Sequence, residues 1–149
     1  MLSAKIEEDL KAAMLAGNKG QVSLLRTIKS ALQYEAVRLG AKERGLSDEE
    51  IQKVLFIEGK KRREAADLYV KAGEQSRAQA EEREAEAIGA YLPEALSDGE
   101  IAALVDGVIA KMGEVTLQDM GRIIEQVRAL NNVADGSAVA RIVKIKLQA

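Results

Sequence analysis

Basic side chains gather in two stretches of this 149-residue sequence, and each stretch is a candidate for holding phosphate groups. The first is densest at residues 60–63 (KKRR), within a window over 53–63 that holds five basic residues and one acidic residue, Glu58. Four consecutive side chains on a helix point in directions that span most of a turn. We therefore expect Lys60 and Arg63 to share one side of the helix, and we predict RNA contacts for them.

A solvated, ion-paired helix face is the alternative for the same stretch. Glu58 and Arg62 are four residues apart, a spacing at which opposite charges pair along a helix. Basic runs are more often solvated faces than binding sites, so the sequence favours this alternative over a phosphate-contacting patch.

The second basic stretch lies toward the end of the sequence. Residues 122–149 hold five basic and two acidic residues, a net charge of +3, whereas residues 93–121 hold one basic and six acidic residues, a net charge of −5. The predicted RNA-binding residues here are Arg122, Arg128, Arg141, Lys144 and Lys146. Cations near a helix C-terminus also complement the helix dipole, so RNA contact and a purely structural role both stay open.

The residue types that are missing exclude most catalytic chemistry. The chain has no His and no Cys, so it has no imidazole base, no Ser-His-Asp triad, no disulfide and no zinc–thiolate site. It carries no phosphate-binding loop, no dinucleotide-binding glycine motif and no EF-hand loop. The sequence therefore predicts no catalytic residue, no metal site and no cofactor.

Charge and apolar content narrow the class of protein further. The net charge of −2 argues against a surface that is basic all over, but it allows a local basic face. No apolar run approaches the roughly 18 residues of a membrane span, and the amphipathic start is unlike a secretory signal. We expect a soluble, cytoplasmic protein that does not contact membranes.

Helices must position these side chains. Apolar residues recur at helical spacing throughout, without strand-like alternation, so we expect an all-α protein. Ser3 is the predicted cap of the first helix, and a second helix is expected over residues 21–38. A long third helix is expected from the capping-box pattern at Ser47 to Gly73, and a fourth from Ser76.

The same periodicity predicts which large side chains are buried. It assigns Met14 to the inner side of the first helix, Leu68 to that of the long helix and Leu130 to that of the sixth. The four aromatic residues also fall at positions predicted to be buried, so we expect no platform for base stacking. These four are Tyr34, Phe56, Tyr69 and Tyr91.

The one proline, Pro93, marks an expected boundary, because proline disfavours helix at the residue before it. We expect an N-terminal helical domain over residues 1–92 and a smaller bundle of three helices over residues 93–149, the first of them with a capping box at Ser97. Gly121 lies inside a predicted helix, where glycine costs about 1 kcal/mol relative to alanine. Close approach of a neighbouring helix is the favoured reason, and room for a ligand or partner is the alternative.

An ordered set of short motifs resembles the GatB/YqeY family, specifically its free-standing YqeY-like members. None is specific alone, but together they run in order along nearly the whole chain. The principal matching stretches are residues 25–32 (LRTIKSAL), 60–65 (KKRREA), 91–93 (YLP), 119–122 (DMGR), 134–136 (ADG) and 142–144 (IVK).

The resemblance implies an all-helical fold with a smaller C-terminal bundle. The chain is also similar to the tail region of the B subunit of the tRNA-dependent amidotransferase. In that enzyme the tail region binds tRNA and is not the catalytic part. The family label further implies carbon–nitrogen ligase activity with glutamine as the amide donor. A chain this short without a phosphate-binding loop has no evident place to activate a carboxylate with ATP, so we expect no activity of its own.

The leading hypothesis is a non-catalytic protein that binds tRNA or assists a tRNA-charging or amidotransferase enzyme. The second hypothesis is a helical adaptor between proteins that does not bind RNA. The oligomeric state stays open.

Overall fold

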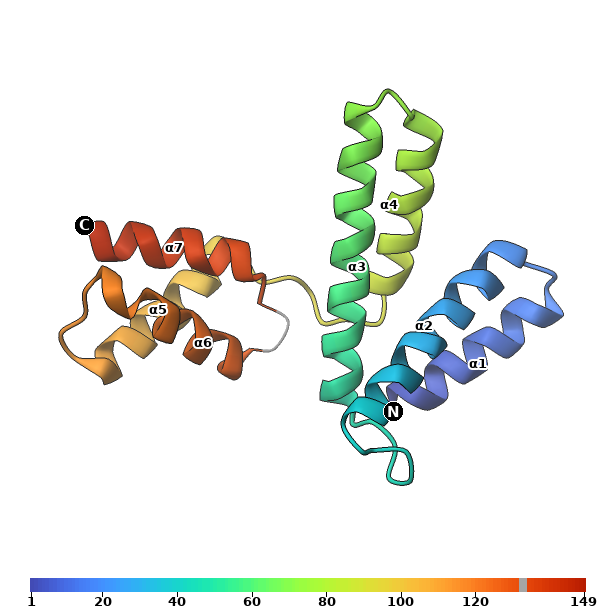
Figure 1. Cartoon of the computed structure of the whole chain (residues 1–149), viewed down its shortest axis with the longest axis horizontal. Helices are drawn as coiled ribbons and strands as arrows, with labels where there is room; N and C mark the ends of the chain where they lie inside the picture. The colour runs from blue at the N-terminus through green and yellow to red at the C-terminus, as the bar shows by residue number, and fades with distance from the viewer. Residues whose placement is uncertain (132–133) are drawn as a thin grey trace. The chain divides into compact units, whose positions relative to one another are not determined.

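The helices expected from the sequence form the whole of the described architecture. A computed structural model describes residues 1–131 and 134–149 and shows seven α-helices, one 3₁₀ turn and no β-strand among them (Figure 1), which confirms the all-α prediction. The elements are α1 (Leu2–Leu15), α2 (Lys19–Arg38), α3 (Asp48–Lys71), α4 (Gln75–Gly89), α5 (Asp98–Met112), η1 (Leu117–Asp119), α6 (Met120–Leu130) and α7 (Gly136–Gln148). No described helix is both long and apolar enough to cross a membrane.

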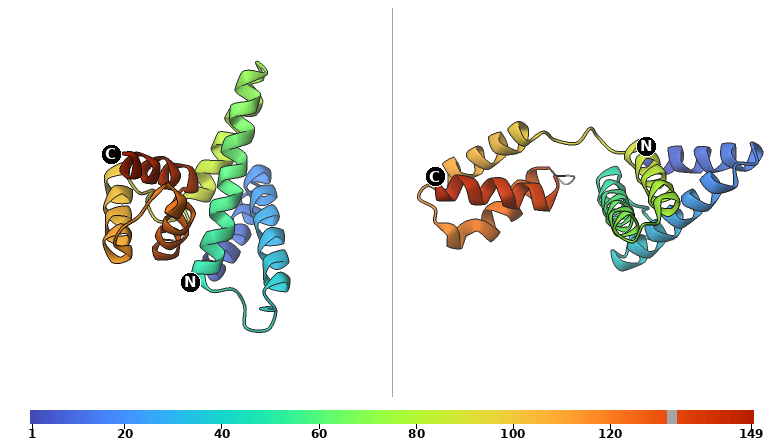
Figure 2. Two further views of the ribbon diagram at one scale, coloured as in Figure 1. Left: turned by 60° about the vertical axis from the view of Figure 1, so that its left-hand side comes forward. Right: turned by 90° about the horizontal axis from the view of Figure 1, so that it is seen from above.

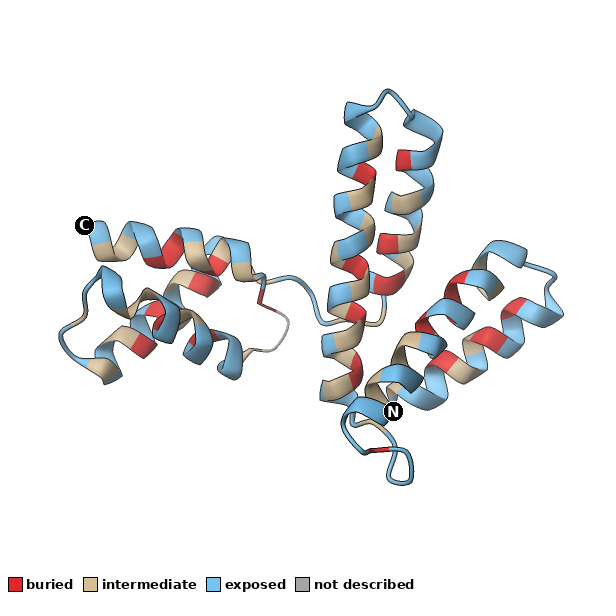
Figure 3. Ribbon diagram, in the orientation of Figure 1, coloured by how far each residue is buried: buried red, intermediate tan, exposed pale blue. Residues whose placement is uncertain are grey.

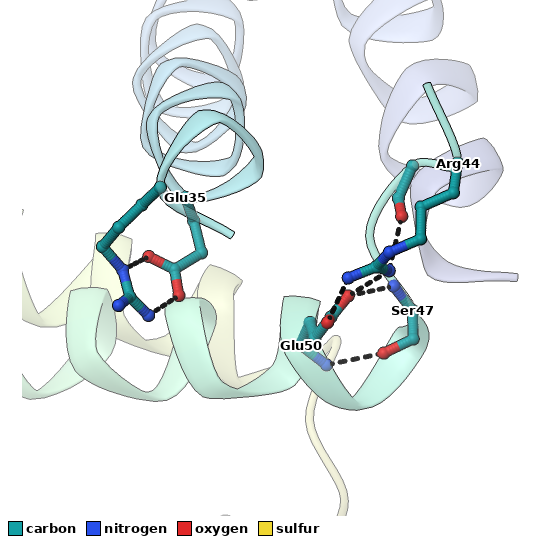
Figure 4. Close-up of polar contacts among 6 residues, drawn as sticks. Glu35, Arg44, Ser47 and Glu50 are labelled. Atoms are coloured by element: carbon teal, nitrogen blue, oxygen red, sulfur yellow. Dashed lines mark hydrogen bonds and ion pairs between the residues drawn. The ribbon is translucent and has the colours of Figure 1, made fainter. Parts of the chain in front are cut away.

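Two capping boxes fix the starts of α3 and α5, as the sequence predicts. The Glu50 amide donates to Ser47 Oγ at 3.2 Å, and the Ser47 amide donates to the Glu50 carboxylate at 2.7 Å (Figure 4). Ser97 and Glu100 repeat this pair of bonds at 3.1 and 2.8 Å. Each pair satisfies two backbone donors that a helix start otherwise leaves open.

The start of α1 is capped from a distance, and the predicted cap at Ser3 is wrong. The helix begins at Leu2, and no side chain at its own N-cap position accepts a hydrogen bond. Instead, the Leu2 amide donates to Asp48 Oδ1 at 3.0 Å. A carboxylate at the start of α3 therefore satisfies an open donor of α1, and the two helix starts are held together.

The chain divides into two compact units, Met1–Leu92 and Pro93–Ala149, and each has its own apolar core. In the first unit α1 lies beside α2 and α3 beside α4 (Figures 1 and 2). Its buried core residues are Ile6, Leu10, Leu24, Leu25, Ile28, Ile51, Leu55 and Ile88. In the second unit α5, α6 and α7 bury Ile101, Val105, Val108, Ile123, Val127, Ala134, Val139, Ile142 and Val143.

Small residues let α3 and α4 approach closely. Gly59 is buried, and a Cβ placed on it would lie 3.6 Å from Cγ2 of Ile88. Ala66 on α3 and the pair Ala78 and Ala85 on α4 are buried as well. The seam between these two helices therefore combines small residues with the buried side chain of Ile88.

Buried positions form narrow stripes along the helices, with exposed surface between them (Figure 3). Three large side chains predicted to be buried are in fact exposed: Met14, Leu68 and Leu130. Met14 and Leu130 stand near the C-termini of α1 and α6, and each lines a groove. Leu68 belongs to the last two turns of α3, where the facing part of α4 buries only Ala78.

A hydrogen bond ties α1 to the segment after α4. Tyr91 Oη donates to Asp9 Oδ2 at 2.5 Å, and Lys5 Nζ donates to Asp9 Oδ1 at 3.0 Å. The bonds from Tyr91 and then Lys5 hold the pKa of Asp9 below its ordinary value. Burial, followed by the Asp9 bond, raises the pKa of Tyr91, so the phenol stays protonated as the donor.

Truncation of one buried and one exposed leucine tests the core of the first unit. Leu25 is fully buried, so Leu25→Ala is expected to lower the free energy of unfolding by about 2–5 kcal/mol. Leu15 is 91% exposed, so Leu15→Ala should change it by less than about 0.5 kcal/mol. Urea unfolding followed by circular dichroism measures both values, and equal losses would contradict this core.

The Tyr91–Asp9 bond has a testable pH dependence. Tyr91→Phe is expected to lower the free energy of unfolding by about 1 kcal/mol near neutral pH. Because the folded-state pKa of Asp9 is lowered, this contribution is present above about pH 4 and is lost as the pH falls through that lowered pKa. Urea unfolding of wild type and variant over a pH series should show a difference that shrinks in acid; a difference that grows there would rule the bond out as its source.

Candidate nucleic-acid interface

Two of the predicted RNA-binding cations are ion-paired within the second unit. Arg141 Nη2 on α7 lies 2.9 and 3.0 Å from the two carboxylate oxygens of Asp98 at the start of α5. Lys146 Nζ lies 2.8 Å from Asp106 Oδ1, also on α5. The acidic first part and the basic last part of this unit therefore neutralise each other in part across the α5–α7 packing.

The other three predicted cations of this unit remain accessible. The Arg122 side chain is 68% exposed, and its nearest carboxylate, Asp119, is 3.7 Å away. In the described part of the chain no carboxylate pairs with Arg128 or Lys144, and both are exposed. The Arg128 guanidinium lies beside Gly136, since a Cβ placed there would be in ordinary contact with Arg128 Nη1 at 3.7 Å. These three cations come from α6 and α7, which pack together.

The basic run of α3 is in part structural. Arg62 is only 12% exposed, and it donates to Glu58 Oε2 at 2.9 Å and to Glu84 Oε2 on α4 at 3.0 Å. The predicted Glu58–Arg62 pair is therefore confirmed, and the arginine also joins two helices. Burial opposes the charge on Glu58, but hydrogen bonds from Arg62 and Lys61 outweigh it and lower the pKa of Glu58.

The two residues of this run that we predicted to bind RNA lie in different surroundings. Arg63 is exposed on α3, and its Nη1 would lie 3.4 Å from a Cβ on Gly59. Lys60 is half-buried. The structure thus leaves Arg63 as the accessible cation of this pair, and both belong to the first unit.

A further basic surface on α1 and α2 was missed by the sequence reasoning. Residues 10–34 contain four basic and no acidic residues. Lys19 and Arg26 line an open groove of about 510 Å³ together with Met14, Ser23 and Thr27. A search for acid-free windows, and not only for dense basic runs, finds this segment.

Tyr34 lies on α2 as well, and its predicted burial is wrong. It is 74% exposed, because the buried side of this helix is formed by Leu24, Leu25 and Ile28 on the opposite face. The other three aromatic residues are half-buried.

The predicted reason for Gly121 is also wrong. A Cβ placed there would meet no atom within 4 Å, so no helix approaches closely. Gly59, by contrast, faces a neighbouring helix, because a Cβ placed there would contact Ile88 of α4 at 3.6 Å. Room for a partner at Gly121 stays a prediction.

Ion pairs and hydrogen bonds shift the pKa values of several carboxylates downward and of several arginines upward. Hydrogen bonds from Arg44, at 2.8 and 3.0 Å, and then from the Ser47 amide lower the pKa of Glu50 to about 2 (Figure 4). The Arg38 bond lowers the pKa of Glu35. Carboxylates that are held ionised and arginines that are held protonated stabilise structure but do not exchange protons near pH 7. Within residues 1–131 and 134–149 no cluster of three acidic side chains could hold a metal ion, and no polar side chain is fully buried.

Comparison with known proteins identifies the family. The family model described as Yqey-like protein matches residues 3–147, which is nearly the whole chain. None of the curated proteins matches the sequence significantly. The chain therefore belongs to the YqeY-like family.

Proposed function

We propose that this chain is a cytoplasmic, non-catalytic RNA-binding protein that serves a tRNA-charging or tRNA-dependent amidotransferase enzyme. The observation that carries the proposal is the set of accessible cations on the second unit. Arg128 and Lys144 have no carboxylate partner among the described residues, and Arg122 is held only loosely. Two neighbouring cations, Arg141 and Lys146, are paired with carboxylates of α5.

Cations without a nearby carboxylate are available to bind phosphate groups. Each phosphate that they neutralise releases condensed counterions, which makes the affinity fall with added salt. The chain has a net charge of −2, so its binding rests on a local surface and not on general attraction. We therefore propose moderate, strongly salt-dependent affinity.

The absence of catalysis in this proposal has a physical basis. A carbon–nitrogen ligase must activate a carboxylate and deliver ammonia to it, which needs acid–base groups poised near neutral pH. Hydrogen bonds lower the pKa values of four carboxylates: Asp9, Glu35, Glu50 and Glu58. These lowered pKa values lie further from neutral pH than the ordinary ones, which supports a binding role beside an enzyme that carries the chemistry.

Charge reversal on the second unit tests this proposal. Arg128→Glu combined with Lys144→Glu should weaken binding of unfractionated tRNA by at least about tenfold, and it should reduce the slope of log affinity against log salt by roughly 1.5 over about 50–200 mM. Fluorescence anisotropy with labelled tRNA measures both quantities. The matched control is Lys42→Glu with Lys71→Glu, two exposed lysines of the first unit whose reversal changes the net charge equally. No binding by the wild-type chain at low salt, or equal losses in both double variants, would reject the proposal.

An adaptor without RNA binding is the second candidate, and a groove in the second unit favours it. The groove has a volume of about 330 Å³ and lies between Leu104, Gly107 and Lys111 of α5 and Ala129 and Leu130 of α6. Leu130 is an exposed large apolar side chain at its wall. A chain that binds no tRNA, and that loses a nuclease-resistant protein partner on Leu130→Glu, would favour this candidate.

A further inference from the structure

The outer face of α2 is a continuous exposed surface along the whole helix. The buried side of α2 is formed by Leu24, Leu25 and Ile28, and the positions on the opposite side are all exposed. This outer face carries Lys19, Ser23, Arg26, Ser30, Tyr34 and Val37. At its N-terminal end it forms one wall of the groove of about 510 Å³ that Met14 closes from α1.

The charge of this face is uniform. Lys19 and Arg26 are separated by two helical turns, about 10 Å, and point to the same side of α2. In the described part of the chain neither has a carboxylate partner, whereas the nearby Lys29 is paired with Glu7 at 2.6 Å. Residues 10–34 contain no acidic side chain, so nothing within this segment competes for the two cations.

Large apolar side chains stand at both ends of the face. Met14 and Leu15 are 53% and 91% exposed at the end of α1, and Tyr34 and Val37 are 74% and 60% exposed near the end of α2. Met14 lines the groove, and exposed apolar side chains that lie along one surface mark interaction sites more often than scattered ones do. Lys19 and Val37 are about 27 Å apart along the helix, which matches a partner helix of about 18 residues.

From this arrangement we infer that the α1–α2 groove and the outer face of α2 bind an acidic amphipathic helix of a partner protein. Apolar side chains of that helix cover Met14 and Tyr34, and two carboxylates about two turns apart reach Lys19 and Arg26. A nucleic acid fits less well, because the exposed side chains of Met14, Leu15 and Val37 offer no hydrogen bond or charge to a phosphate. A lipid surface fits less well, because Lys19 and Arg26 line a groove, which a helix can enter and a flat surface cannot. The inference is independent of RNA binding by the second unit.

Selection from a random peptide library tests the inference on the full chain. A displayed library of peptides of about 18 residues is expected to enrich helical sequences with apolar residues and with Asp or Glu about two turns apart. Lys19→Glu combined with Arg26→Glu should weaken the enriched peptides by at least about tenfold in fluorescence anisotropy. Leu15→Ala and Met14→Ala should each weaken them by severalfold without loss of helicity.

A charge swap separates direct contact from general attraction. Replacement of the two peptide carboxylates by lysine should restore binding to the Lys19→Glu, Arg26→Glu variant and abolish binding to wild type. The control variant Lys42→Glu, Lys71→Glu should bind the original peptides normally.

Several outcomes would overturn the inference. Enriched peptides without acidic residues would do so, as would undiminished binding to the Lys19→Glu, Arg26→Glu variant. Loss of binding to single-stranded RNA or to phosphatidylserine vesicles in that variant, with no peptide enriched, would assign the face to those ligands instead. None of these results bears on Arg128 and Lys144, so failure here is distinct from failure of the proposed RNA binding.

Discussion

Each helix of this protein has only a narrow apolar stripe, and the structure depends on pairing those stripes. In α1 the buried residues are Ile6, Leu10 and Ala13, and in α2 they are Leu24, Leu25 and Ile28. Although 47% of the residues are hydrophobic, large apolar side chains outside these stripes, such as Leu15 and Ile145, are exposed. Helices of this kind pack on one side only, so each unit has a single small core. The opposite sides remain as charged or mixed surface, and the candidate binding surfaces lie there.

Local patterns predicted much of this fold because their causes are local. The capping boxes at Ser47 and Ser97 join residues three positions apart, and the Glu58–Arg62 pair follows from helical spacing alone. The spacing of apolar residues predicts which side of a helix faces inward, but it does not predict whether another element covers that side. Met14 and Leu130 were therefore assigned to the interior although they are exposed.

The candidate site was harder to predict, because it depends on contacts between distant residues. Net charge over residues 122–149 suggested five equivalent cations, but Arg141 is paired with Asp98, which is 43 positions away. The hydrogen bond that caps the Leu2 amide is likewise made by a distant residue, Asp48. Gly59 and Gly121 look alike in the sequence, and only the packing of α4 on α3 distinguishes them. Counting charges finds where cations are abundant, whereas the fold decides which of them are already neutralised.

The small-residue seam between α3 and α4 has a thermodynamic consequence. Because α4 buries only Ala78, Ala85 and Ile88, its separation from α3 exposes little apolar surface. The heat capacity of unfolding and the denaturant dependence both scale with newly exposed surface. Opening of this hairpin toward its turn at Gly73 therefore adds less to the heat capacity of unfolding and to the steepness of a urea transition than loss of a seam of large side chains would. Amide hydrogen exchange along α4 reports this opening where the separated helix also unfolds, since exchange requires its backbone hydrogen bonds to break.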